Sequence, residues 1–274
     1  MSWADIQSFL ESWFLNPGIE WHFILIAIGV ALVFGGIWLA FYRQPRSTNL
    51  WLPGVMLFGA FFTVVAVALV QLPLQYYIGQ GMSDTWSYGT LNAWLLLASI
   101  PTLLVGGLVQ EGAKMVPMVA WWRGRKNLDP KLGLAIGAMA GFGFGVFNGF
   151  WINAYTLGAG WSFDLFSEDW FSAISPFWQS FFFIGLQTAT SALAGYGLAK
   201  GLGWQFFLIA GVLNSALTYS SVLYQKGYLT STQADIYIAG VAALVTIAAL
   251  ILRYRKGKAI EPVLPPPEPA QPNA

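Results

Sequence analysis

Residues 91–122 read LNAWLLLASIPTLLVGGLVQEGAKMVPMVAWW, a long apolar run that carries Gln110, Glu111 and Lys114 near its end. Glu111 and Lys114 are the only acid–base pair set within hydrophobic sequence anywhere in the chain. Three residues apart, they share one face of a helix and can form an ion pair. A charge inside a membrane helix is costly, so it normally faces the protein interior or a wet cavity. Glu111 and Lys114 are therefore candidate catalytic residues, and an ion pair near the lipid headgroups is the alternative interpretation.

The composition around this run is that of an integral membrane protein. Hydrophobic residues make up 57% of the chain and charged residues only 9%, whereas soluble domains carry about 25% charge. The net charge of +1 argues against a nucleic-acid partner. The chain has no cysteine, which excludes disulfides and thiolate metal sites, and its single histidine is His22.

Apolar segments of the length that a bilayer requires, roughly 20 residues, recur along the chain. They predict an all-α fold, a polytopic membrane helix bundle of about seven transmembrane helices. The third segment is too long for one straight crossing, so we expect either a kink at Pro101 or Pro117 or an end that lies along the cytoplasmic surface. The predicted spans are 21–42, 51–76, the run from Leu91, 132–157, 177–199, 204–223 and 235–252.

The charges of the loops predict an orientation. Arginines and lysines follow the first, third, fifth and seventh spans, whereas the opposite loops are mainly acidic. Cytoplasmic loops carry an excess of basic residues, so we expect the N-terminus outside and the C-terminus in the cytoplasm.

Three regions follow from these patterns. Residues 1–20 repeat apolar side chains at helical spacing, which predicts an amphipathic helix on the membrane surface. Residues 21–258 form the transmembrane bundle, in which 158–176 is an outer, aromatic and acidic interfacial loop. Residues 259–274 are rich in proline and predict a disordered cytoplasmic tail.

The spans after the central run carry small and polar residues in regular patterns. The fourth has glycines four residues apart from Gly133 to Gly149, which lets neighbouring helices approach closely and predicts a central helix. Carboxamides in hydrocarbon need partners and usually find them across helices. We predict one buried polar cluster, with helix–helix adhesion as its alternative role. Its candidate members are Gln110, Glu111, Asn148, Gln187, Ser191 and Asn214.

Several of these stretches resemble one family. The run 110–114 resembles the Glu-Glu-x-x-Lys motif of the PrsW-type intramembrane proteases, relatives of the CAAX-processing endopeptidase and bacteriocin-immunity superfamily. Residues 129–137 are similar to that family's acidic-Pro-x-x-Gly start of the next helix, and Gly-Phe-Gly-Phe follows at 141–144. Residues 187–197 and 213–217 are similar to two family helices that begin with histidine. The resemblance spans about 94–223 and implies an intramembrane peptidase fold in the plasma (inner) membrane of a prokaryote.

The departures from the family pattern fall on its functional positions. Gln110 stands at the first glutamate, Asn148 at the glutamate after Gly-x-Gly-Phe, and Gln187 and Asn214 at the two histidines. Zinc takes imidazole, thiolate or carboxylate ligands, and one carboxylate with three amides is a poor transition-metal site. His22 begins the first span at the opposite membrane face. We therefore expect no metal site, no zinc and no other cofactor.

Three functions remain open from the sequence. The first is a catalytically impaired relative, a pseudoenzyme that binds a membrane-embedded peptide or a lipid in the former substrate cavity. The second is an active endopeptidase in which Glu111 is the general base and the amides polarise the peptide carbonyl. The third is a transporter or channel. The expected partners are the lipid bilayer and a transmembrane peptide or protein substrate.

Overall fold

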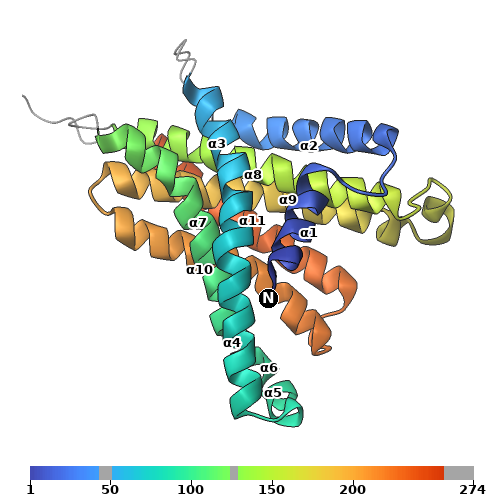
Figure 1. The fold of residues 1–274 in the computed structure, drawn as a ribbon. Coiled ribbons are helices and arrows are strands. Elements are labelled where there is room, and N and C mark those ends of the chain that lie inside the picture. Colours follow the sequence, from blue (N-terminus) through green and yellow to red (C-terminus); the bar gives the residue numbers. More distant parts are fainter. Residues whose placement is uncertain (43–50, 124–128, 256–274) are drawn as a thin grey trace, which may run out of the picture.

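The computed structural model describes residues 1–42, 51–123 and 129–255, and these ranges contain helices and no strands (Figure 1). The helices are α1 (Trp3–Phe14), α2 (Trp21–Phe41), α3 (Trp51–Ala66), the π-helical turn η1 (Val67–Gln71), α4 (Leu72–Thr85), α5 (Tyr88–Ala93), α6 (Leu95–Ala98), α7 (Ile100–Arg123), α8 (Pro130–Gly158), α9 (Leu165–Ala199), α10 (Gly203–Gln225) and α11 (Ser231–Tyr254).

The prediction of an all-α polytopic bundle is confirmed. Among the described residues, six helical stretches are long and apolar enough to cross a membrane, and the chain is a multi-pass membrane protein. The predicted span 177–199 is the second part of α9 and is not one of the six. Its centre carries Gln187, Thr188, Thr190 and Ser191, which make it less apolar than the others. The six stretches are 21–41, 52–85, 95–120, 130–158, 203–225 and 231–254.

The central run is broken before either of its two prolines, and a kink at Pro101 or Pro117 stays a prediction. The run from Leu91 is broken at Trp94 (φ −100°, ψ 20°), between the short helices α5 and α6, and again at Ser99 before α7. Pro101 lies in the first turn of α7, where its missing N–H has no intrahelical partner to lose. Pro117 lies inside α7, which continues through it. The chain therefore turns at Trp94 and again at Ser99, two residues before Pro101.

The second predicted span is longer than expected and has a π-helical turn at its middle. α3, η1 and α4 form one continuous helical rod from Trp51 to Thr85, beyond the predicted end at Tyr76. A π-helical turn closes i to i+5 hydrogen bonds and shifts the faces of the helix after it. This turn ends at Gln71, so it sets the direction of Gln71 and of Gln75 one turn later.

The segment 158–176, predicted to be an outer loop, is largely helical. α9 begins at Leu165, and its axis bends at Asp169, which has φ −151° and ψ 91°. The Asp169 carboxylate accepts hydrogen bonds from the backbone N–H of Phe171 (3.1 Å) and of Ser172 (3.3 Å). Asp169 thus acts as an N-cap within the helix and restarts α9 toward the bundle.

The N-terminal segment forms α1, which packs on the bundle through aromatic side chains such as Trp13 and Phe14. Trp13 is buried and stacks on Trp151 of α8 with ring centroids 4.9 Å apart. The backbone carbonyl of Ser12 accepts hydrogen bonds from Trp151 Nε1 (3.1 Å) and Tyr155 Oη (3.3 Å). The position of α1 at a membrane surface stays a prediction, and the predicted tail 259–274 lies outside the described residues.

α8 is the central helix, as its glycines predict. It contacts α2, α3, α7 and α9, and it runs beside α9 along most of its length (Figure 1). A methyl group on Gly137 would collide with the backbone carbonyl of Ser191, and one on Gly141 with that of Gln187. The absence of side chains along this stripe therefore fixes α9, with its polar residues, directly against α8.

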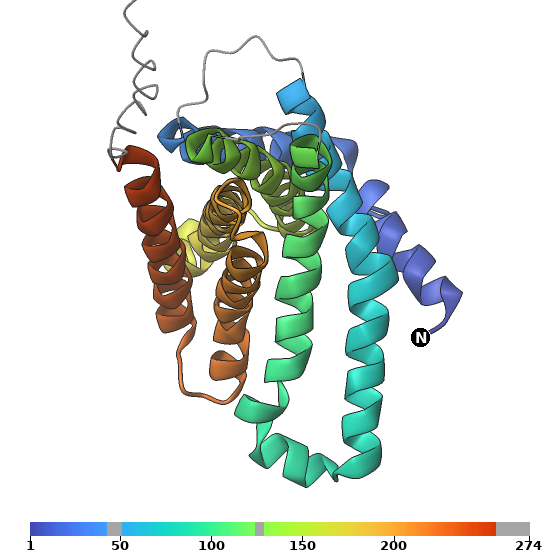
Figure 2. The same cartoon turned by 90° about the vertical axis from the view of Figure 1, so that its left-hand side faces the viewer.

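A second group of helices runs across this pair. The α3–η1–α4 rod and α7 lie side by side and cross α8 and α9 steeply, and α10 lies beside α7 (Figures 1 and 2). The ends of α2 and α11 meet where Tyr254 Oη donates to the Phe41 carbonyl over 3.4 Å. At the other end of the bundle, Lys226 Nζ donates to the Asn92 carbonyl. Between these two ends, α7, α9 and α10 contact one another in all three pairs.

Candidate functional site

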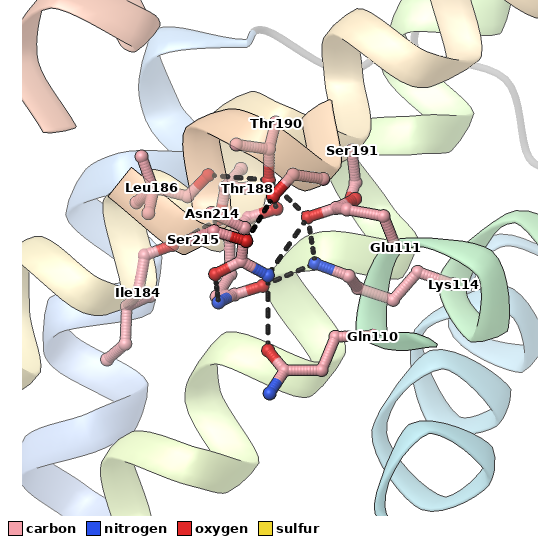
Figure 3. A network of polar contacts seen from close by, with 12 residues as sticks. Gln110, Glu111, Lys114, Ile184, Leu186, Thr188, Thr190, Ser191, Asn214 and Ser215 are labelled. Atoms are coloured by element: carbon pink, nitrogen blue, oxygen red, sulfur yellow. Dashed lines mark hydrogen bonds and ion pairs between the residues drawn. The ribbon is translucent and has the colours of Figure 1, made fainter. Parts of the chain in front are cut away.

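Glu111 and Lys114 form a fully buried ion pair on α7. Both side chains have no exposed surface, and Lys114 Nζ donates to Glu111 Oε1 over 2.6 Å (Figure 3). The two residues are three apart, so they lie on one side of the helix. An ion pair in such a place is tolerated only if further hydrogen bonds satisfy both charges.

α9 supplies hydrogen bonds to the carboxylate. Thr190 Oγ1 donates to Glu111 Oε1 over 2.7 Å, and Ser191 Oγ donates to Glu111 Oε2 over 3.1 Å. Thr190 Oγ1 also lies 3.0 Å from the Leu186 carbonyl. Because hydrogen bonds to a charged acceptor are the stronger ones, the single hydroxyl proton is best placed on Glu111.

The ammonium group of Lys114 is satisfied on a different side. Lys114 Nζ donates to Gln187 Oε1 and lies 5.6 Å from the centre of the Phe144 ring of α8. The face of an aromatic ring attracts a cation at this distance. Three helices thus surround this charge, which lies between a carboxylate, a carboxamide oxygen and a ring.

Asn214 of α10 joins the two carboxamides to the ion pair. Its Oδ1 accepts from Gln187 Nε2 over 3.0 Å, and its Nδ2 donates to Gln110 Oε1 over 3.1 Å. Asn214 Nδ2 also lies 3.5 Å from Glu111 Oε1. Asn214 is 2% exposed, so all its partners are protein groups.

The structure therefore brings five of the six predicted cluster residues into one hydrogen-bonded network, together with Lys114, and leaves one out. Asn148 is buried on α8, one turn beyond Phe144, but its side chain makes no hydrogen bond to any described residue. The six members are Gln110, Glu111, Lys114, Gln187, Ser191 and Asn214.

The sequence prediction missed Thr190, which donates to Glu111, and two glutamines, Gln71 and Gln75. Gln110 Nε2 donates to Gln71 Oε1 over 3.1 Å, Gln71 Nε2 donates to Gln75 Oε1 over 3.4 Å, and Gln75 Nε2 donates to the Thr102 carbonyl over 2.8 Å. Gln71 and Gln75 lie four residues apart in apolar sequence, and this spacing on one helix face could have indicated that both belong to the buried polar cluster. The π-helical turn precedes Pro73, which marks an irregularity in the helix but does not by itself predict that Gln71 faces α7.

The carboxamides form a chain with a single direction. From Lys114, donors and acceptors follow in order through Gln187, Asn214, Gln110, Gln71 and Gln75 to the Thr102 carbonyl. An ammonium group only donates, so Gln187 must present its oxygen to Lys114 and its nitrogen to Asn214. A carbonyl only accepts, so the other end imposes the same direction. Hydrogen bonds aligned in this way strengthen one another.

The residues at this site do not fit a metal ion. Among the described residues, no three His, Cys, Asp or Glu side chains gather into a possible metal site. The one carboxylate, Glu111, already accepts from Lys114, Thr190 and Ser191, and the oxygens of Gln187, Asn214 and Gln110 each face an N–H donor. Their lone pairs therefore do not converge on one point, and amides are poor ligands for zinc.

His22, the only histidine of the chain, lies elsewhere. It is at the start of α2, with its Nδ1 3.3 Å from Glu20 Oε2, and both side chains are exposed. It is not part of the network, as expected from the sequence.

Residues 47–162 of the chain match the sequence model of a family described as PrsW family intramembrane metalloprotease. The matched region contains α3 to α8, with Gln71, Gln75, Glu111 and Lys114, and it ends before α9 and α10. It begins earlier in the chain than the resemblance seen in the motifs. No curated protein and no solved structure matches the chain.

Proposed function

We propose that this chain has the fold of a PrsW-type intramembrane protease and binds a membrane-embedded polypeptide without cutting it. The family match over 47–162 supports the fold, and the chemistry of the network argues for binding rather than hydrolysis. We further propose that the protein lies in the plasma membrane of a prokaryote with its C-terminus in the cytoplasm.

One observation carries the proposal, the saturation of Glu111. A carboxylate has about four acceptor sites, and Glu111 receives Lys114, Thr190 and Ser191 at 2.6–3.1 Å, with Asn214 at 3.5 Å. A general base must reach the proton that it removes, either directly or through one water. Glu111 has no exposed surface and no unused side from which to do so.

The neighbours of Glu111 argue in the same direction. The Lys114 ammonium group is only 2.6 Å from the carboxylate and takes one of its acceptor sites. The candidate oxyanion donors are Asn148, Gln187 and Asn214, and the last two each already use an amide N–H within the network, toward Asn214 and Gln110. The active endopeptidase would therefore require the network to open first, and binding requires no such step.

The decisive experiment expresses the protein with reporters in which different transmembrane segments join a cytoplasmic tag to an external tag. We expect the amount of intact reporter to be equal for the wild-type protein and for Glu111→Gln. We also expect reporters to co-purify with the wild-type protein. Both variants are compared at matched amounts of folded protein, measured by thermal unfolding.

Cleavage at one site that is lost in Glu111→Gln but kept in Asn148→Leu would contradict the proposal and establish the endopeptidase. Asn148→Leu is the matched control because it removes a buried carboxamide that has no hydrogen bond to the network.

A further inference from the structure

The outer part of the carboxamide chain differs from the inner part in its access to the surroundings. Glu111, Lys114, Gln187 and Asn214 are buried, whereas Gln110, Gln71 and Gln75 are each half-buried. We call Gln110, Gln71 and Gln75 the amide row. It leads from the buried ion pair along the contact between α7 and the α3–η1–α4 rod.

The amide row has unused hydrogen-bonding capacity. A carboxamide has two N–H donors and two oxygen lone pairs. Within the row each side chain uses one N–H, toward the next member or the Thr102 carbonyl, and one lone pair, toward the previous member. One donor and one acceptor are left at each half-buried residue, which is the pattern that a strand of polypeptide backbone offers at its edge.

We propose, as a refinement of the proposed function and resting on it, that the amide row binds the backbone of a locally unwound transmembrane segment. In a bilayer core, a peptide group outside a helix has no water to satisfy it. A segment that loses its helix therefore gains most from a row of free amide donors and acceptors.

The chemistry of the row favours a polypeptide over a lipid. None of its three side chains carries a charge, whereas anionic headgroups are recognised by lysines and arginines, and acyl chains have no use for amides. The backbone of an unwound segment alternates donors and acceptors, as the row does.

A hollow in which a segment can lie is found next to the outer end of the row, where Pro101 precedes Thr102. Beyond Thr102, a hollow of about 380 Å³ lies between α4 and the α5–α6–α7 turn, and Trp86, Trp94 and Pro101 are among its lining residues. Apolar side chains of a segment fit such a lining while its backbone reaches Gln75, since Gln75 bonds Thr102, the residue after Pro101.

Gly106 provides the room for the row. A methyl group on this buried glycine of α7 would lie 3.2 Å from both Gln71 Nε2 and Gln75 Nε2, closer than an ordinary contact. Gly106→Ala therefore displaces two row amides without removing either. Gly112→Ala is the matched control on the same helix, because its methyl group meets only Phe207 at an ordinary 3.5 Å.

The test measures the binding of two synthetic peptides to the full-length protein in lipid vesicles. Both peptides are transmembrane Leu–Ala sequences, and one carries a central Gly-Pro pair that unwinds it. Because the chain has no cysteine, a donor dye on Gly81→Cys, where a side chain meets nothing within 4 Å, reports energy transfer to a labelled peptide.

We expect the Gly-Pro peptide to bind more tightly than the intact helix. We expect Gln71→Leu and Gln75→Leu each to weaken its binding about 3- to 15-fold, the range for one hydrogen bond within a membrane. Gly106→Ala should also reduce the preference for the Gly-Pro peptide over the intact helix, and Gly112→Ala should leave this preference unchanged. Gly106→Ala decides the matter if the glutamine variants do not fold.

Equal binding of the two peptides, or a preference that survives Gly106→Ala together with the folded glutamine variants, would overturn the role of the amide row and leave the proposed function in place. Absence of binding by both peptides would instead overturn the proposed function itself.

Discussion

The interface between α8 and α9 and the interface of α7 with α9 and α10 hold the same helix in opposite ways. On one side of α9, glycines of α8 let two backbones touch, so the fit is set by shape. On the other side, Thr190, Ser191 and Gln187 meet Glu111, Lys114 and Asn214 through hydrogen bonds, so the fit is set by charge and direction.

The two interfaces depend on each other. A methyl group on Gly141 would meet Gln187 and Ser191, and one on Gly145 would lie 3.2 Å from Gln187 Cβ. The glycine stripe therefore fixes the backbone of the residues that bind the ion pair. Close packing of α8 against α9 therefore holds Gln187 and Ser191 where they can hydrogen-bond to the ion pair.

The largest effect is expected on the shape side. Gly141→Leu cannot be accommodated because the Gln187 carbonyl occupies the space of its first carbon, and we expect destabilisation of about 3 kcal/mol or more. Thermal unfolding in detergent and the yield of monodisperse protein measure it. Gly36→Leu on α2, where nothing lies within 4 Å, is the control, and equal stability of the two variants would refute the close contact.

On the polar side the largest effect belongs to Lys114→Met. It leaves the Glu111 carboxylate buried without its counter-charge, and breaking a buried pair costs about 3–5 kcal/mol. Adding Glu111→Gln removes the orphaned charge, so the double variant should be more stable than Lys114→Met alone. Denaturation of the wild-type protein, the two single variants and the double variant gives the coupling free energy between Glu111 and Lys114. Additive effects would show that the two groups do not interact.

A smaller effect separates the network from the rest of the buried carboxamides. Gln187→Leu removes an acceptor from Lys114 and a donor to Asn214, and we expect a loss of about 1–2 kcal/mol. Asn148→Leu removes an amide that bonds no described residue and should cost less than half as much. The same unfolding assay measures both, and the reverse order would place Asn148 within the network.

The smallest expected effect is none. Incubation with a metal chelator, or with added zinc, should leave the Tm unchanged, because the oxygens of the network face N–H and O–H donors rather than a common point. A ligand that binds the folded state raises the Tm. A fall in Tm with the chelator that zinc restores would show that a metal belongs to this protein.

The sequence was informative where one residue type dictates one geometry. Apolar runs gave the spans, the glycines spaced four apart gave the central helix, and carboxamides in hydrocarbon gave the buried network around Glu111. Each of these follows from a requirement of the bilayer, which satisfies no polar group.

The sequence was less informative where backbone detail decides. The break at Trp94 and the helical restart at Asp169 have no proline or glycine at the residue itself. The π-helical turn that ends at Gln71 is followed by Pro73, which has no N–H for the Leu69 carbonyl, but a proline alone does not say which kind of irregularity it produces. Asn148 has the same carboxamide group as Gln187 and Asn214. The α8 side chain that reaches Lys114 is Phe144, one turn before Asn148, and Asn148 stays outside the hydrogen bonds. Which face of a buried helix meets which neighbour is not encoded by residue type.

The saturation of Glu111 is tested most directly by chemical labelling. A hydrophobic carbodiimide modifies carboxyl groups that it can reach, and mass spectrometry of the labelled protein in lipid vesicles identifies them. We predict that Glu111 of the wild-type protein remains unmodified while exposed Glu20 reacts, and that Lys114→Met makes Glu111 reactive. Modification of Glu111 in the wild-type protein to the same extent as Glu20 would contradict the account, because the carboxylate would then be open to substrate and water.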